Sequence, residues 1–110
     1  MALVDNFTIT GKSGTMYPFK VYPMGQAFKA LGGVYAITKR ELRLGNAPLY
    51  HFVYIGETGD LSTRFDNHHK QACFDKAGAD FIGVHLDGAQ KSRTSTESDI
   101  LAAHKWPCND

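Results

Sequence analysis

Two short segments rich in β-branched and aromatic residues lie close together in mid-chain, and they constrain the fold most. They are GVYAIT at residues 33–38 and YHFVYIG at residues 50–56. Residues of these types favour strands, and both runs have the usual length of a strand. The polar connection KRELRLGNAPL contains Gly45, Asn46 and Pro48. We therefore expect an antiparallel pair with a long tip.

The segment that precedes this pair predicts a second hairpin. NFTIT and TMYPFKVY flank the turn sequence GKSG, and Tyr17, Phe19 and Val21 recur at every second position, as in a half-buried strand. Because Pro18 cannot donate a backbone hydrogen bond, we expect this strand at an edge of the sheet. The next segment, PMGQAFKALGG, has no firm period and predicts a loop.

Two helices are expected in the second half of the chain. The first lies in ETGDLSTRFDNHHKQACF, where Thr58 or Asp60 would cap it. After a strand at FIGVHL, the second lies in KSRTSTESDILAAHK, and Pro107 would end it. The inner face of the first helix would carry Leu61, Phe65, Ala72 and Cys73. This order predicts an α+β fold, with a small central antiparallel sheet flanked by helices.

Length and composition limit the class of protein. The chain has 110 residues, which fits one domain, and its net charge of +1 gives no overall basic field. Any contact with nucleic acid must therefore come from local charges. Cys73 and Cys108 form no CxxC motif, so we expect reduced thiols and a cytoplasmic location. The sequence lacks a signal peptide pattern and an apolar run that would span a membrane.

Several residues are candidates for chemistry. On a helix, Arg64 and His68 would share one face, and an arginine there suits a phosphate group, although a solvated surface pair is the alternative. Glu97 would point towards the apolar face of its helix, where a carboxylate needs a partner or a metal ion. An ion pair with Arg93, one turn earlier, is the structural alternative.

Tyrosines and basic residues on the central hairpin are less specific signals. Tyr35 and Tyr54 lie on strands, where tyrosines mostly pack, and their function would require both hydroxyls to reach the cleft of Arg64 and Glu97. The hairpin tip carries basic residues that would suit a nucleic-acid backbone, although Glu41 dilutes their charge. The spacing of the histidines matches no strong zinc motif. The basic residues of the tip are Lys39, Arg40 and Arg43.

As a set, these segments resemble the GIY-YIG nuclease superfamily. GVY stands for the first motif, with valine in place of isoleucine, and YIG is the second motif. ETGDLSTRFDNH is similar to the glycine turn and arginine segment of the family, and ESDILAAHKWPCN is similar to its glutamate segment with the closing Pro-x-Asn. The resemblance covers residues 33–109. The family's functional residues match Tyr35, Tyr54, Arg64, His68, Glu97 and Asn109.

The resemblance implies metal-dependent hydrolysis of phosphodiester bonds in DNA. Arg64 would bind the phosphate oxygens, and Glu97 would hold Mg²⁺ or Mn²⁺ with water and phosphate oxygens. Tyr35 would deprotonate the attacking water, with Tyr54 and His68 assisting, and Asn109 would orient the site. His68 is the rival base, because its ordinary pKa of about 6.5 is nearer to neutral pH than the value of about 10 of tyrosine.

The domain organisation that follows has two parts, a β-hairpin extension at residues 1–32 and a GIY-YIG-like nuclease domain at residues 33–110.

Glu57 departs from the family pattern and would either repel a phosphate, help to hold metal, or face solvent. The chain has no room for a separate DNA-recognition domain, so a partner protein, a homodimer or the first 32 residues would have to supply specificity. Two alternatives stay open: a nucleic-acid-binding module without catalysis and an interaction domain of a larger assembly.

Overall fold

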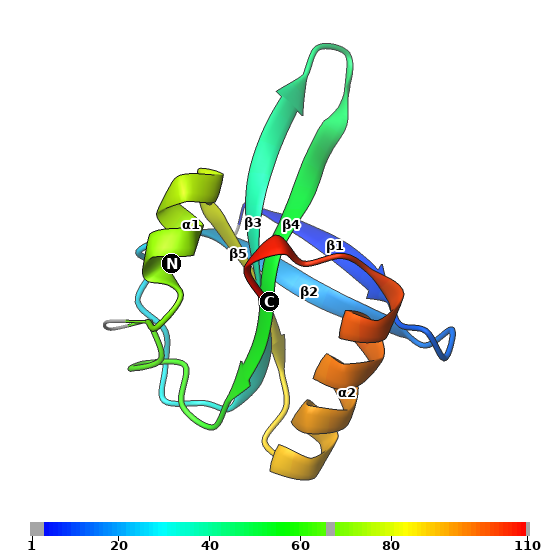
Figure 1. Cartoon of the computed structure of the whole chain (residues 1–110), viewed down its shortest axis with the longest axis vertical. Helices are drawn as coiled ribbons and strands as arrows, with labels where there is room; N and C mark the ends of the chain where they lie inside the picture. Colours follow the sequence, from blue (N-terminus) through cyan, green and yellow to red (C-terminus); the bar gives the residue numbers. More distant parts are fainter. Residues whose placement is uncertain (1–3, 66–67, 110) are drawn as a thin grey trace.

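The computed structural model describes residues 4–65 and 68–109. The five strands form one antiparallel sheet in the order β1-β2-β5-β3-β4. The β3–β4 hairpin continues beyond the other strands as a projecting ribbon (Figure 1). The elements in chain order are β1 (Asp5–Thr10), β2 (Met16–Pro23), β3 (Gly33–Arg43), β4 (Asn46–Thr58), α1 (Gln71–Ala77), β5 (Phe81–Leu86), α2 (Gln90–Ala103) and the 3₁₀ turn η1 (Pro107–Asn109).

The predicted α+β fold, a small central sheet flanked by helices with the N-terminal hairpin as an extension, is wrong. The protein is mostly sheet, with 42% strand and 23% helix, and the sheet curls into a half-barrel. The N-terminal hairpin belongs to this sheet, because β2 pairs with β5 from Lys20 to Pro23. This pairing satisfies the edge of β5, which would otherwise leave backbone groups without partners. The sheet thus crosses the boundary between residues 32 and 33, while the two-part domain division itself remains a prediction.

Both predicted hairpins are confirmed, but the position of β2 is not. β2 lies between β1 and β5, so the expectation that Pro18 marks an edge strand is wrong. Pro18 is tolerated there because β2 pairs with β5 only from Lys20 onwards. No hydrogen bond between these strands therefore needs a donor at the Pro18 nitrogen. In the β3–β4 hairpin, most of the predicted polar connection belongs to the two strands. The turn itself consists of the two residues between Arg43 and Asn46.

The first predicted helix is much shorter than expected. Residues 61–65 form turns, and the helix covers only Gln71–Ala77. Thr58 and Asp60 accept hydrogen bonds from the amides two residues further on, at Asp60 and Ser62, and so stabilise turns in place of a helix start. Ala72 is exposed, and Phe74 is the buried residue of α1. The second helix and the strand at residues 81–86 are confirmed.

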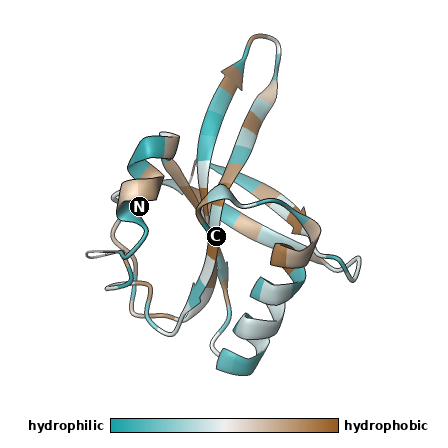
Figure 2. Ribbon diagram, in the orientation of Figure 1, coloured by the Kyte–Doolittle hydropathy of each residue, from teal (hydrophilic) through white to brown (hydrophobic). Residues whose placement is uncertain are grey.

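Buried side chains lie on both faces of the sheet. β3 lies between β5 and β4, and its alternate residues enter two different clusters. Tyr35 and Ile37 pack on one face, while Val34 and Ala36 pack on the other. The apolar residues of the sheet are visible as brown segments in Figure 2, whereas α2 is pale over most of its length. Trp106 and Ile100 cover the second face. Burial on both faces explains why GVYAIT contains almost only apolar residues.

A disulfide joins the two cysteines, so the expectation of reduced thiols is wrong. Cys73 of α1 and Cys108 of η1 are 35 residues apart in sequence and bonded to each other. The bond fastens the C-terminal segment to α1. Within the described ranges, no helix is long and apolar enough to cross a membrane.

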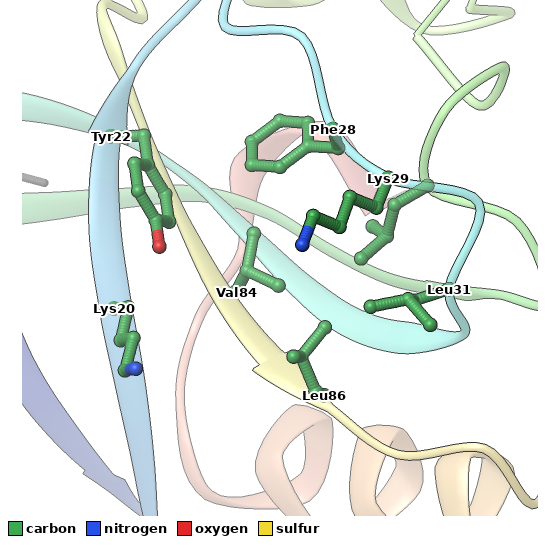
Figure 3. Close-up of a pocket in the computed structure, with 8 residues that line it drawn as sticks. Lys20, Tyr22, Phe28, Lys29, Leu31, Val84 and Leu86 are labelled. Atoms are coloured by element: carbon green, nitrogen blue, oxygen red, sulfur yellow. The ribbon is translucent and has the colours of Figure 1, made fainter. Parts of the chain in front are cut away.

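A small pocket of about 200 Å³ opens beside β2 and β5. β2 and β5 form two sides of the pocket, and the loop between β2 and β3 forms another side. Lys29 extends from this loop over the pocket (Figure 3). The pocket lies outside the segments that carry the family motifs, except for Leu61 at its margin.

Candidate active site

Two tyrosines from neighbouring strands form the base of the site. Tyr35 of β3 and Tyr54 of β4 stack with ring centroids 6.0 Å apart. Tyr35 lies directly opposite Gly56 in the strand register. A Cβ atom on Gly56 would stand 2.5 Å from Cζ and from the hydroxyl oxygen of Tyr35. The glycine of the YIG segment therefore makes room for the Tyr35 ring.

His68 binds Tyr35 through a buried hydrogen bond. The distance between His68 Nε2 and the Tyr35 hydroxyl oxygen is 2.9 Å, and the Lys70 amide donates to His68 Nδ1 at 3.0 Å. Because an amide can only donate here, neutral His68 carries its hydrogen on Nε2 and donates it to Tyr35. Burial, then the charges of Arg64 and His69, lower the pKa of His68 to about 4. His68 is therefore neutral at pH 7.

Arg64 is a half-buried cation beside the two tyrosines. Its Cζ lies 5.9 Å from the centroid of the Tyr35 ring. Burial and the nearby Tyr54 raise the pKa of Tyr35 well above its usual value, while Arg64 acts in the opposite direction. Burial also raises the pKa of Tyr54, against the effect of Arg64. Both tyrosines are therefore protonated at neutral pH.

Glu97 of α2 is half-buried and close enough to Arg64 and Tyr54 to affect them electrostatically. Burial first, and then the negative charge of Glu57, raise the pKa of the Glu97 carboxyl, and Arg64 lowers it. Glu97 also contributes to the raised pKa of Tyr54. Residues from β3, β4, the segment after β4 and α2 thus influence one another electrostatically across one site.

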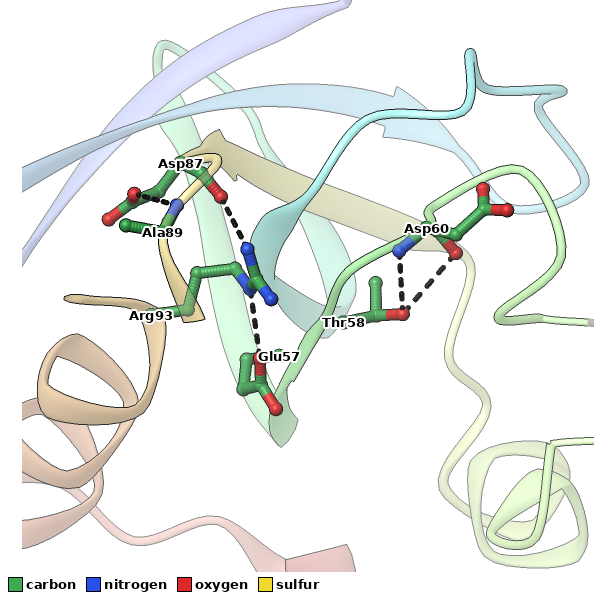
Figure 4. A network of polar contacts seen from close by, with 6 residues as sticks. All are labelled: Glu57, Thr58, Asp60, Asp87, Ala89 and Arg93. Carbon is green, nitrogen blue, oxygen red and sulfur yellow. Dashed lines mark hydrogen bonds and ion pairs between the residues drawn. The ribbon is translucent and has the colours of Figure 1, made fainter. Parts of the chain in front are cut away.

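Glu57 and Arg93 form a separate ion pair beside Glu97. Arg93 Nε donates to Glu57 Oε1 at 2.9 Å, and Arg93 also donates to the Asp87 carbonyl oxygen (Figure 4). The predicted alternative of an Arg93–Glu97 pair is therefore wrong, and Glu57 does not simply face solvent. Sequence reasoning missed this pair because its members are 36 residues apart.

The carboxylate of Glu97 is the type of ligand that a magnesium-like ion prefers. Glu97 is a half-buried carboxylate whose raised pKa indicates that its negative charge is poorly compensated. Carboxylate oxygens with several waters are the usual shell of Mg²⁺. Within residues 4–65 and 68–109 there is no cluster of three or more metal-ligating side chains, so Glu97 would act with water and substrate oxygens.

Asn109 contacts the backbone of the strand that carries Tyr54. The Ile55 amide donates to Asn109 Oδ1, and Asn109 Nδ2 donates to the Ile55 carbonyl, both at 2.9 Å. The amide of Asn109 therefore holds the C-terminal segment against the outer edge of β4. This arrangement gives Asn109 a positioning contact with the site, through the backbone next to Tyr54.

The basic residues of the hairpin lie further along β3 than Tyr35. The Arg40 guanidinium packs over the Phe81 ring at 5.0 Å, and Arg43 donates to the Ala47 carbonyl and so closes its own hairpin. Lys39 is exposed. Glu41 contacts His51 at 2.8 Å, so its charge has a local partner. These residues belong to the projecting ribbon, and their contact with nucleic acid remains a prediction.

Comparison with known proteins adds no relative. No family model matches the chain, and no curated protein and no solved structure matches it. The chemistry of the site is therefore inferred from its own residues and geometry.

Proposed function

We propose that the chain is a metal-dependent endonuclease that hydrolyses phosphodiester bonds in DNA, of the GIY-YIG type that its motifs resemble. One observation carries the proposal: Tyr35, Tyr54, Arg64 and His68 are neighbours although they come from distant segments, and Glu97 of α2 is close enough to Arg64 to interact with it electrostatically. A cation, a carboxylate and buried phenols together suit an anionic ester that gains charge in its transition state.

Arg64 and Glu97 have complementary roles in this proposal. The guanidinium of Arg64 binds the non-bridging phosphate oxygens, because its planar donors match them. The Glu97 carboxylate holds Mg²⁺ or Mn²⁺, which when bound supplies charge stabilisation at the leaving oxygen. The ion pair with Arg93 offsets the charge of the second carboxylate, Glu57, which would otherwise repel the phosphate more strongly.

Tyr35 is the better candidate for the general base. Both ring nitrogens of His68 are engaged, and the one that faces Tyr35 carries a hydrogen, so His68 has no lone pair ready for a proton. The hydrogen that His68 donates favours the phenolate form of Tyr35, as does the charge of Arg64. Since burial outweighs this help in the free protein, only a small fraction of Tyr35 is ionised at pH 7.

A plasmid-nicking assay with magnesium tests the proposal. Glu97→Gln and Arg64→Gln should each lose about a hundredfold or more in rate. Asp75→Asn removes an exposed carboxylate of α1, outside the ribbon and the candidate site, and should cut like the unaltered protein. Equal rates for the unaltered protein and Glu97→Gln would end the enzyme hypothesis.

The pH profile of the cleavage rate separates the two candidate bases. If Tyr35 is the base, the rate should climb about tenfold per pH unit from pH 6 to 9, because the phenolate fraction grows with pH. If His68 is the base, the rate should be flat over this range, because its pKa of about 4 leaves it neutral throughout.

A binding module without catalysis is the second candidate function. The raised pKa of Tyr35 and the engaged nitrogens of His68 favour it, since neither group is a ready base at neutral pH. Binding of DNA that persists in chelator, with no turnover in magnesium or manganese, would select this function.

Location and partners belong to the same proposal. We keep the cytoplasm as the proposed compartment, although the disulfide is more typical of an oxidising one. Mass spectrometry of protein that is alkylated rapidly and isolated without reductant counts the thiols that were free, and so shows which condition applies. A partner protein or a homodimer remains the proposed source of specificity.

A further inference from the structure

The pocket beside β2 and β5 combines flat rings with positive charge. Val84 and Leu86 of β5 form an apolar floor, and Tyr22 of β2 and Phe28 of the following loop stand beside it (Figure 3). The two aromatic rings meet edge to face with centroids 5.5 Å apart. Such a surface accepts another flat ring by stacking.

Two lysines give this pocket its charge. Lys20 and Lys29 are both exposed and line the pocket from β2 and from the loop, with no carboxylate among the other lining residues. We refer to it as the lysine pocket. Its volume of about 200 Å³ is smaller than that of pockets for drug-sized ligands, which is about 300–1,000 Å³. The lysine pocket therefore suits a ligand with one ring system. A flat ring flanked by anionic groups is therefore the complementary ligand.

A row of rings connects the lysine pocket with the candidate active site. Phe28 lies 5.9 Å from Phe65, and Phe65 lies 5.0 Å from Tyr35, measured between ring centroids. Arg64 directly precedes Phe65 in the chain. Tyr22, Phe28 and Phe65 all pack against the core cluster that contains Tyr35, so the pocket and the active site share one face of the sheet.

We propose that the lysine pocket binds one unpaired nucleotide of the strand that is cleaved at Arg64 and Glu97. The base stacks on Tyr22 and Phe28, and Lys20 and Lys29 neutralise the two phosphates that flank it. This inference rests on the proposed function and adds a substrate class, nucleic acid with a single-stranded portion next to the cut. Most of the pocket is built from residues before Gly33, outside the segment that resembles the nuclease family.

Binding of a single-stranded oligodeoxynucleotide that contains one 2-aminopurine tests the inference without turnover. With chelator present, the unaltered protein should quench the fluorescence of the probe, because the base stacks on an aromatic ring. Lys20→Ala/Lys29→Ala should weaken binding about tenfold or more. It should also reduce the slope of log affinity against log salt by about 1.4, or about 0.7 for each phosphate contact on a single strand.

Matched variants and competitors make the test specific. Lys12→Ala/Lys76→Ala removes the same charge from exposed lysines outside the pocket and should bind like the unaltered protein. Phe28→Leu should keep most of the salt dependence and lose much of the quenching, since Tyr22 is then the one stacking ring left among the described residues that line the pocket. A duplex of the same sequence should bind at least about tenfold more weakly, because its bases are not free to stack.

Equal losses in the two lysine double variants, or equal binding of duplex and single strand, would overturn the lysine pocket as a nucleotide site. The fate of the proposed function is measured separately, by cleavage in magnesium of the plasmid and of a duplex that carries a single-stranded portion. A protein that quenches the probe through the lysine pocket but never cuts would refute only the cleavage.

Discussion

Gly56 is the residue at which the stability of the site is most sensitive to one added carbon. Gly56→Ala would place Cβ 2.5 Å from the Tyr35 ring, which is buried and cannot move without disturbing Phe65 and His68. We expect a loss of about 1–3 kcal/mol in the free energy of unfolding, typical of overpacking. Urea denaturation measures it. Gly88→Ala is the control and should change stability little, since nothing lies within 4 Å of its Cβ.

His68 should make the stability of the protein depend on pH. Its pKa of about 4 in the folded state lies below the ordinary value of 6.5, so protonation favours the unfolded state. The contribution is complete above about pH 6.5 and is lost as pH falls towards 4, by up to about 3 kcal/mol.

Thermal melts of the unaltered protein and of His68→Gln between pH 7 and 4 measure this effect. The glutamine can still accept from the Lys70 amide and donate to Tyr35, but it does not titrate. The melting temperature of His68→Gln should therefore fall less steeply with acid. Parallel curves for the two proteins would show that His68 keeps an ordinary pKa.

At the scale of elements, α1 depends on tertiary contacts. It has seven residues, no side-chain cap at its start and one buried residue, Phe74. Helices this short are not stable alone in water. The ring centroid of Phe74 lies 5.4 Å from that of Tyr54 and 4.9 Å from that of His68. Through Phe74, α1 therefore packs directly against two residues of the candidate site.

The disulfide should supply much of the stability of this part of the protein. Reduction of Cys73–Cys108, which closes a loop of 35 residues, should cost about 2–4 kcal/mol because the unfolded chain gains freedom. Denaturation with and without dithiothreitol measures the difference. The double variant Cys73→Ser/Cys108→Ser should resemble the reduced protein and ignore the reductant. A protein whose midpoint is unchanged by dithiothreitol would contradict this expectation.

At the scale of the whole molecule, the sheet does not divide at residue 33. Ile9 and Phe19 from the first hairpin are buried in the same cluster as Val34, Ala36 and Ile55. A fragment of residues 33–110 would expose this apolar surface and the pairing edge of β5. We therefore expect it not to fold cooperatively, in contrast to the full chain.

Circular dichroism during thermal denaturation of both chains tests this expectation. The full chain should show one sigmoidal transition, and the fragment should show none. Mixing the fragment with a peptide of residues 1–32 should restore part of the transition if the hairpin docks on β5. A sharp transition of the fragment alone would support the predicted two-part organisation instead.

The sequence by itself determined where most strands lie and which side chains are candidates for the site. Alternation and β-branched residues are local signals, so the hairpins and the strand at residues 81–86 could be predicted from them. The resemblance selected Tyr35, Arg64 and Glu97. The structure places Arg64 beside the Tyr35 ring, and Glu97 is close enough to Arg64 for their charges to influence each other.

Tertiary structure alone decided the arrangement of these pieces. The pairing of β2 with β5, the Arg93–Glu57 ion pair and the Cys73–Cys108 bond each join segments far apart in the chain. Patterns of neighbouring residues carry little information about such pairings, because these depend on which surfaces remain to be buried once the other elements have formed.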